Sequence, residues 1–376
     1  MKSTPARPVQ LLIAAAAAAA VLLLVVWFFE RIPTEGTTLA LDWLGIRMGV
    51  EHWDLTYSPN TGLRIPPWTA QILLPLGQIP MKSGWGVIAF LTLIVLLLCV
   101  PRKQESGRKW IAGVLALTLS FPALRTMADG NVEFLILGGL VLLEYGLVRA
   151  NPLLFGLGIL LAAAKVQETW ILLVFLPLVA GRTWNVRKWL ATIGVLALVG
   201  LPSMVWKGRD WLFSIITHQF RGSVMDSSLL TSVQRSGGSL GLALLLWAAV
   251  FGLTVFFSLR YIRGYSRETV GFLIAVSLLL APYTAGNNVL IVYALGVVPL
   301  LISRRWEGLL LAALINLPYL LLPFWEINFL YSASYWTLVL VLAWILFALR
   351  LRELRRKPDP ELGAADFQSL GAASGI

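Results

Sequence analysis

The chain alternates between long apolar runs and short polar segments. Several runs reach the roughly 20 apolar residues that a helix needs to cross the hydrocarbon core of a bilayer. We predict twelve membrane-spanning helices, over residues 9–29, 84–100, 110–127, 131–148, 152–165, 167–181, 189–206, 238–259, 269–284, 287–303, 306–323 and 333–350. The pattern therefore predicts an all-α, polytopic membrane protein.

The first apolar run resembles a signal peptide only at its start, where Lys2 and Arg7 precede it. The run is longer than the roughly 7–15 residues of a signal, and bulky residues follow it where a cleavage site needs small ones. We expect a retained first span.

Basic residues indicate the orientation of the spans. Most of the 30 Lys and Arg residues fall on one side of the predicted map, at positions 2–7, 102–109, 149, 182–188, 260–267, 304–305 and 350–357. Short loops rich in Lys and Arg face the cytoplasm. We therefore expect a protein of the plasma membrane with both termini in the cytoplasm.

Two segments, 30–82 and 207–237, are predicted as long outward loops of one integral domain that covers residues 1–357. Residues 66–80 are apolar but too short to span as a helix, and they contain Pro66, Pro67 and Pro75. We expect an interfacial helix there, with Pro67 in its first turn. The tail, 358–376, is predicted to be disordered in the cytoplasm.

The stretch LALDWLGIRMGVEHW within the first outward loop carries the leading candidate for catalysis. Leu39, Trp43, Ile46 and Val50 recur at helical spacing, which indicates an amphipathic helix at the membrane interface. Asp42 falls near its start, at headgroup depth, and is our candidate for a general base. The alternative is an Asp that only caps the helix.

Cations and hydroxyl groups on the outer side are candidates for binding an anion. Lys165 ends an apolar run, where a cation faces either a cavity or lipid headgroups, and phosphate is its natural ligand. The alternative is a lysine that extends along the span to the interface. At the same level lie Arg125, Asp129 and Gly130, and the second outward loop offers a set of donors, namely His218, Arg221, Ser227, Ser228, Gln234 and Arg235.

Composition excludes several classes of protein. The chain is 58% hydrophobic and 13% charged, whereas soluble domains carry about 25% charged residues. The net charge of +11 resides in loop clusters and does not indicate nucleic acid. Cys99 is the single cysteine, and the sequence has no P-loop, HExxH motif, His/Cys cluster or closely paired aspartates. We expect no metal and no cofactor.

The order of motifs resembles glycosyltransferase family 87, a family of membrane enzymes with the GT-C fold. Its members carry an Asp and an aromatic residue, a Tyr, then Y-x-P-P, P-L and L-P in the first outward loop. The matching residues here are Asp42-Trp43, Tyr57, Pro66-Pro67, Pro75-Leu76 and Ile79-Pro80, with Arg64 or Ile65 in place of the tyrosine before the prolines.

Later motifs continue the resemblance over roughly residues 30–300. Gly130-Asn131 is similar to the family's G-Q or G-N, and Lys165-Val166-Gln167 to K-P-Q without its proline. Ser227 through Arg235 resembles an S-L…R segment. The family's S-P-x-x-W-x-H falls on residues 281–288, where both the Trp and the His are missing.

The resemblance implies a GT-C fold and inverting transfer of a sugar, often mannose, from a polyprenyl-phosphate donor to a lipid or glycan acceptor. Asp42 would be the base. Lys165 and Arg235, with His218 or Arg221, would hold the phosphate. The substrate-binding candidates are Asp54, Tyr57, Arg64, Asn131, Gln167, Ser227 and Ser228. Because nucleotide sugars are not available outside the membrane, a lipid-linked donor suits a site that faces outward.

Two other functions remain open on the sequence. A transporter or flippase of lipid-linked sugars favours internal repeats and polar residues at mid-bilayer, and neither is visible here. A ligase or polymerase that uses a diphosphate-linked donor would share the architecture.

Overall fold

We analysed a computed structural model of the chain. It describes residues 7–35, 37, 39–57, 63–100, 107–181, 184–217, 226–262, 264–320 and 329–356. The predicted tail at 358–376 lies outside this part of the chain.

Every regular element in the described segments is helical, which agrees with the predicted fold class. The elements are α1 (Arg7–Arg31), α2 (Leu41–Glu51), η1 (Trp53–Leu55), α3 (Pro67–Gly77), α4 (Met81–Cys99), α5 (Gly107–Thr118), α6 (Phe121–Asp129), α7 (Glu133–Val148), α8 (Pro152–Ala162), η2 (Ala163–Lys165), α9 (Val166–Gly181), α10 (Val186–Thr217), α11 (Leu229–Arg235), α12 (Leu240–Tyr261), α13 (Arg267–Leu279), η3 (Gly286–Asn288), α14 (Val289–Val292), η4 (Tyr293–Val297), α15 (Val298–Ile302), α16 (Trp306–Asn316) and α18 (Phe329–Arg356).

Fewer helices than predicted are long and apolar enough to cross a membrane. In the described part of the chain six qualify, and a seventh is added if α5 and α6, bent by 51°, count as one span. The predicted number of twelve is therefore not confirmed. Several predicted spans are short helices here: α7 has 16 residues, α13 has 13 and α16 has 11, or roughly 17–24 Å of helix.

The helical run from α8 to α9 is one of these six, yet it folds back on itself. In a straight helix Phe155 and Trp184 would lie about 43 Å apart. Their ring centroids are 4.9 Å apart. The chain therefore reverses at η2, and Lys165 lies at the tip of a helical hairpin, as the two predicted spans 152–165 and 167–181 require.

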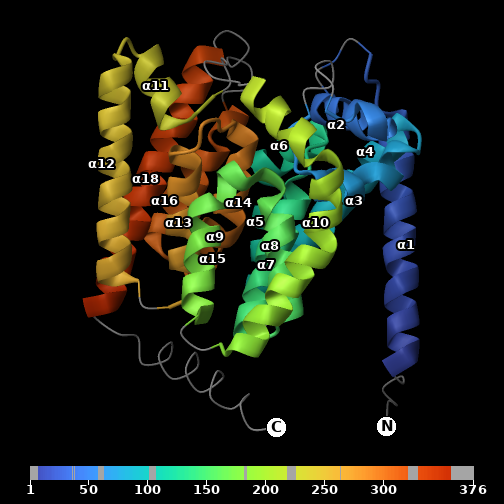
Figure 1. Ribbon diagram of the computed structural model, residues 1–376, viewed down its shortest axis with the longest axis horizontal. Coiled ribbons are helices and arrows are strands. Elements are labelled where there is room, and N and C mark those ends of the chain that lie inside the picture. Colours follow the sequence, from blue (N-terminus) through green and yellow to red (C-terminus); the bar gives the residue numbers. More distant parts are fainter. Residues whose placement is uncertain are drawn as a thin grey trace.

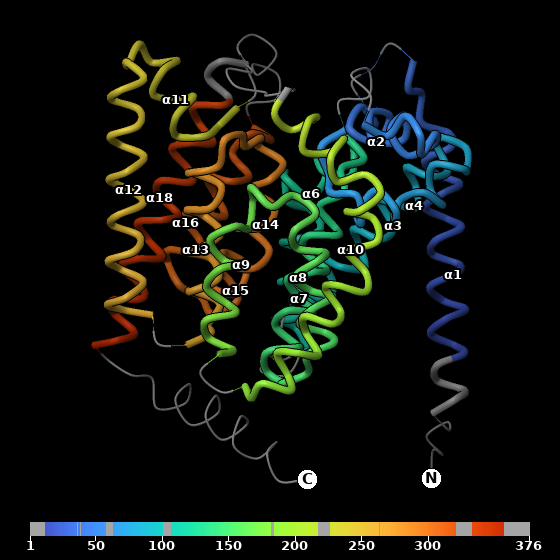
Figure 2. The backbone as a smooth tube through the Cα atoms, in the orientation of Figure 1, coloured from blue at the N-terminus to red at the C-terminus, as the bar shows by residue number. Residues whose placement is uncertain are grey.

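The bundle has two chemically distinct ends (Figure 1). At one end lie α2, α6 and α11, with the tip of the α8–α9 hairpin. At the other end α1 begins and α18 finishes, as the tube in Figure 2 also shows. We call the first the α2 end and the second the basic end, because Arg108 and Arg355 lie near helix ends there and Arg304 lies in the link after α15.

The two short helices expected in the first outward loop are both present. In α2, Trp43 and Val50 are buried while Leu41, Leu44 and Met48 are exposed, so the helix is amphipathic as predicted. Helix α3 starts with Pro67 at its first position and spans 11 residues, about 16 Å. It is too short to cross a bilayer.

The second predicted loop begins later than expected. Helix α10 runs for 32 residues to Thr217, so residues 207–217 are helical rather than loop. Trp211 and Ser214 explain this extension, because their side chains donate hydrogen bonds to the carbonyl groups of Arg64 (2.7 Å) and Leu63 (3.1 Å). These hydrogen bonds hold the end of α10 against residues 63–64 of the first outward loop.

Candidate active site at the α2 end

Helix α2 is held in place by backbone and indole hydrogen bonds at its start. Ala40 adopts a left-handed conformation (φ 56°), and its N–H donates to the carbonyl of Ala128 at 2.8 Å. The fully buried Trp43 donates from Nε1 to the carbonyl of Met81 at 2.9 Å. The first turn of α2 is thus fixed against α6 and α4.

Gly130 provides the turn that brings the next residue to Asp42. It ends α6 with φ 68°, and a Cβ there would come within 2.5 Å of the Cβ of Trp43. A glycine in this conformation closes the helix because it carries no side chain. Directly after it, Asn131 is buried and faces the start of α2.

Asp42 accepts two amide hydrogen bonds on one oxygen. Its Oδ2 accepts from Nδ2 of Asn131 at 2.8 Å and from Nδ2 of Asn287 at 3.4 Å. The N-cap of α2 is Ala40, and no side chain caps the helix. The helix-capping alternative for Asp42 is therefore wrong, because its carboxylate points toward other helices.

Lys165 completes a chain of contacts that ends at Asp42. Its Nζ donates to Oδ1 of Asn131 at 2.8 Å and to Oε1 of Glu133 at 2.6 Å, and it lies 3.5 Å from Oε1 of Glu168. Since an ammonium group has three donors, Lys165 is fully engaged. The alternative of a lysine that extends to the lipid interface is wrong.

Below Lys165 lies a buried pair of carboxyl groups that the sequence analysis missed. Glu133 and Glu168 are 0% and 1% exposed, and Lys165 contacts both of them. Asn288 donates from Nδ2 to Glu133 at 2.8 Å and to Glu168 at 2.7 Å.

One signal in the sequence could have found this pair. Glu133 and Glu168 lie just inside predicted spans, where an ionisable residue marks a functional site by default.

Asn287 and Asn288 occupy the segment in which the family motif S-P-x-x-W-x-H ends. Counted from Pro282, the place of the missing histidine falls on Asn287.

The electrostatic environment favours the neutral form of Asp42. Burial raises the pKa of the Asp42 carboxyl above its ordinary value of 3.8, while the positive charge of Lys165 opposes that shift. Burial raises the pKa of the Tyr283 phenol, and the negative charge of Asp42 is the second largest cause of that increase. Burial lowers the pKa of Arg64 to about 10, and the charges of Arg64 and Lys165 both act on Tyr283.

A second buried acid, Asp226, organises the segment that carries Ser227 and Ser228. Asp226 accepts from the N–H groups of Ser228 (2.9 Å) and Thr284 (3.1 Å), and from the hydroxyls of Ser228 and Thr231. Ser228 also caps α11. Arg235 donates from NH2 to the backbone oxygen of Asp226 at 3.2 Å.

The remaining predicted residues lie at different distances from this network. Tyr57 is buried and donates to the carbonyl of Ile65 at 2.9 Å, which shapes the first loop. Asp54 is exposed and Gln167 is half-buried at the start of α9. His218 and Arg221 lie outside the described residues. Within the described chain, no group of three His, Cys, Asp or Glu side chains could hold a metal ion.

Comparison with known proteins identifies the family of the chain. Neither the characterised proteins nor the solved structures include a match to this chain. The model of glycosyltransferase family 87 matches residues 66–282, which cover α3 through α13 and so include Asn131, Lys165 and both buried glutamates. The chain belongs to glycosyltransferase family 87.

Proposed function

We propose that this glycosyltransferase moves a sugar, mannose in our prediction, from a polyprenyl-phosphate donor to a hydroxyl group of a lipid or glycan acceptor, with inversion. The observation that carries the proposal is the carboxylate of Asp42. It lies on the amphipathic helix α2, is held by the described residues through Oδ2, and stands beside a network of buried charges.

Asp42 is the proposed general base. The acceptor hydroxyl would give its proton to the carboxylate while its oxygen forms a bond to the anomeric carbon. The bond from that carbon to the phosphate oxygen breaks, and the lipid phosphate leaves with the electron pair. Burial supports this role, because a base with a raised pKa takes a proton more readily at neutral pH than an exposed Asp.

Lys165 is proposed to position Asp42 rather than to grip the phosphate directly. Its donors are occupied by Asn131, Glu133 and Glu168. By holding the carbonyl of the Asn131 side chain, Lys165 directs the amide N–H of that side chain to Asp42. Its charge also favours the ionised base.

We propose that the guanidinium group of Arg64, whose charge acts on Tyr283, holds the donor phosphate. Arg64 is half-buried, and its charge acts on the same phenol as that of Asp42. As the phosphate leaves, its negative charge grows, so cations fixed beside it act mainly in the transition state. Arg235 remains a second candidate, together with His218 and Arg221. The site would face outward at the plasma membrane, with both termini in the cytoplasm.

The donor class can be tested directly. The purified protein in lipid nanodiscs would receive the same radiolabelled sugar on a polyprenyl phosphate, on a polyprenyl diphosphate or on a nucleotide, together with a membrane lipid extract as acceptor. We expect transfer from the monophosphate only, with the opposite anomeric configuration in the product. Transfer from the diphosphate would favour a ligase instead, and retention of configuration would remove Asp42 as a simple base.

A further inference from the structure

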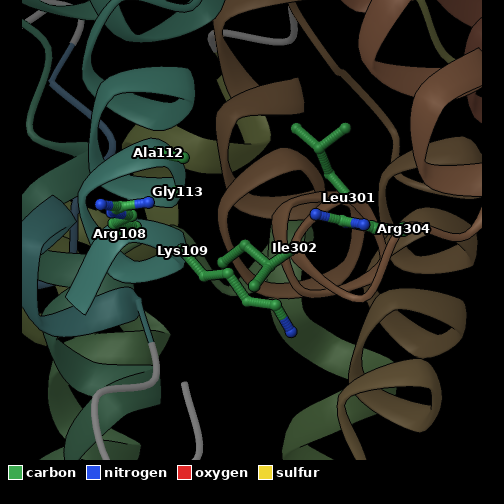
Figure 3. A pocket seen from close by; sticks show the side chains of 7 residues that line it. All are labelled: Arg108, Lys109, Ala112, Gly113, Leu301, Ile302 and Arg304. Atoms are coloured by element: carbon green, nitrogen blue, oxygen red, sulfur yellow. The ribbon is translucent and has the colours of Figure 1, made fainter. Parts of the chain in front are cut away.

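A cavity lies at the basic end of the bundle, away from Asp42. Its volume is about 320 Å³, and Figure 3 shows it between the start of α5 and the link from α15 to α16. Two segments connect this cavity to the candidate active site. One is α5, which continues through α6 to Gly130, and the other is the run from Asn288 to Ile302. The lining residues are Arg108, Lys109, Ala112, Gly113, Leu301, Ile302 and Arg304.

The rim of the cavity is cationic. Arg108 comes from the first turn of α5, and Arg304 from the link after α15, and Figure 3 places them on opposite sides. Both side chains are exposed, and neither pairs with a carboxylate among the described residues. Two other arginines at this end are paired, Arg267 with Glu144 and Arg350 with Glu353.

The wall of the cavity is apolar. Gly113 is buried, and a Cβ there would come within 2.5 Å of Cδ1 of Ile302, so α5 and α15 approach closely above the cavity. Ala112, Leu301 and Ile302 provide the rest of the apolar surface. A ligand here meets positive charge at the rim and hydrocarbon inside.

We propose that this cavity binds an anionic phospholipid. Its phosphate would lie between Arg108 and Arg304, and the start of one acyl chain would lie against Ala112, Leu301 and Ile302. Arginine suits a phosphate because its planar guanidinium can donate two parallel hydrogen bonds. Basic pockets between membrane helices bind anionic headgroups, and free phosphate would leave the apolar wall unused.

The test uses the full-length protein in a neutral detergent, titrated with phosphatidylglycerol, with phosphatidylcholine or with inorganic phosphate. Bound lipid would be counted by native mass spectrometry. The double variant Arg108→Gln/Arg304→Gln removes the rim charges. A matched control, Arg260→Gln/Arg352→Gln, removes two exposed cations from the same end but outside the cavity. Ala112→Trp fills the cavity and keeps every charge.

We expect one phosphatidylglycerol to bind with a preference over phosphatidylcholine. Each cation near the surface contributes about 1 kcal/mol to such binding, so the double variant should bind about 30-fold more weakly and the control should be unchanged. Ala112→Trp should also lose the bound lipid. Equal losses in the double variant and the control would show general charge attraction and overturn the proposal. Competition by inorganic phosphate at similar concentration would assign the cavity to a free anion.

Discussion

Asp42 and Asp226 are two acids at the α2 end, and the structure uses them in opposite ways. Asp226 is fully buried and accepts hydrogen bonds on both oxygens, from two backbone N–H groups and two hydroxyls. Asp42 is half-buried, and from the described residues it accepts hydrogen bonds on Oδ2, from two side-chain amides. A carboxylate with every lone pair occupied holds a fold together, whereas one with an open oxygen can take a proton.

The surroundings of the two acids strengthen this contrast. The partners of Asp226 come from its own segment and from Thr284, so Asp226 stabilises the local structure of these two segments. The partners of Asp42 lie far along the chain, on the turn after α6 and on η3. Asp42 thus depends on the assembly of several helices, which is typical of a site that must be fixed for chemistry.

The largest expected effect is the loss of activity in Asp42→Asn. Asparagine keeps the shape but cannot take a proton at neutral pH, so the rate of transfer should fall by ~10²–10⁴. The measurement is sugar transfer in membranes with expression matched between variants. Activity within a few-fold of the unmodified protein would end the claim for Asp42 and direct attention to Asp54 or Glu51.

The same variant should fold normally, and the sign of the pKa shift explains why. The folded pKa of Asp42 is raised, so ionising this group costs stability as pH increases above its ordinary value of 3.8. Asparagine removes that cost. The thermal unfolding temperature of Asp42→Asn at pH 7 should therefore equal or exceed that of the unmodified protein, with no gain at pH below 3.8.

The opposite pattern is expected at Asp226. Asp226→Ala leaves the buried N–H groups of Ser228 and Thr284 without an acceptor, at ~1–3 kcal/mol each. Asp226→Asn keeps one acceptor oxygen, and the two hydroxyls can turn to accept from its amide, so it should be less damaging. Thermal unfolding in detergent would rank the variants. If Asp226→Ala were as stable as the unmodified protein, the stabilising role of Asp226 would be refuted.

The sequence predicted the elements better than their contacts. The amphipathic α2, the proline-led α3 and the hairpin with Lys165 at its tip follow from local patterns of residues. The bond from Lys165 to Asn131 and the buried pair of Glu133 and Glu168 join segments at least 30 positions apart, and no local pattern specifies them. The predicted number of spans is not confirmed, because several apolar runs in the described chain form helices shorter than a bilayer core.

A smaller effect is expected for Lys165→Met, and its signature is a pH profile. The positive charge of Lys165 lowers the pKa of Asp42 against the effect of burial, so its removal raises that pKa further. The acidic limb of the rate profile should move to higher pH, because less of the base is ionised at each pH. Lys165→Arg keeps the charge and should move the limb less. An unshifted limb in Lys165→Met, with lower activity at every pH, would indicate a structural role alone.

The smallest effect should come from Asn287→Ala, which sharpens the account of how Asp42 is held. Asn287 donates to Asp42 at 3.4 Å, a long contact, while Asn131 donates at 2.8 Å and also accepts from Lys165. A typical hydrogen bond contributes about 1 kcal/mol, and a contact as long as this one should contribute no more, so its loss should lower the transfer rate about five-fold or less. Asn131→Ala should cost clearly more, because it disconnects Asp42 from Lys165 as well. Turnover of the two variants at matched abundance gives the comparison. If Asn287→Ala were the more damaging, Asn287 would have a contact with substrate in addition to its bond to Asp42. Its side-chain oxygen is the atom available for that contact, because this oxygen has no partner among the described residues.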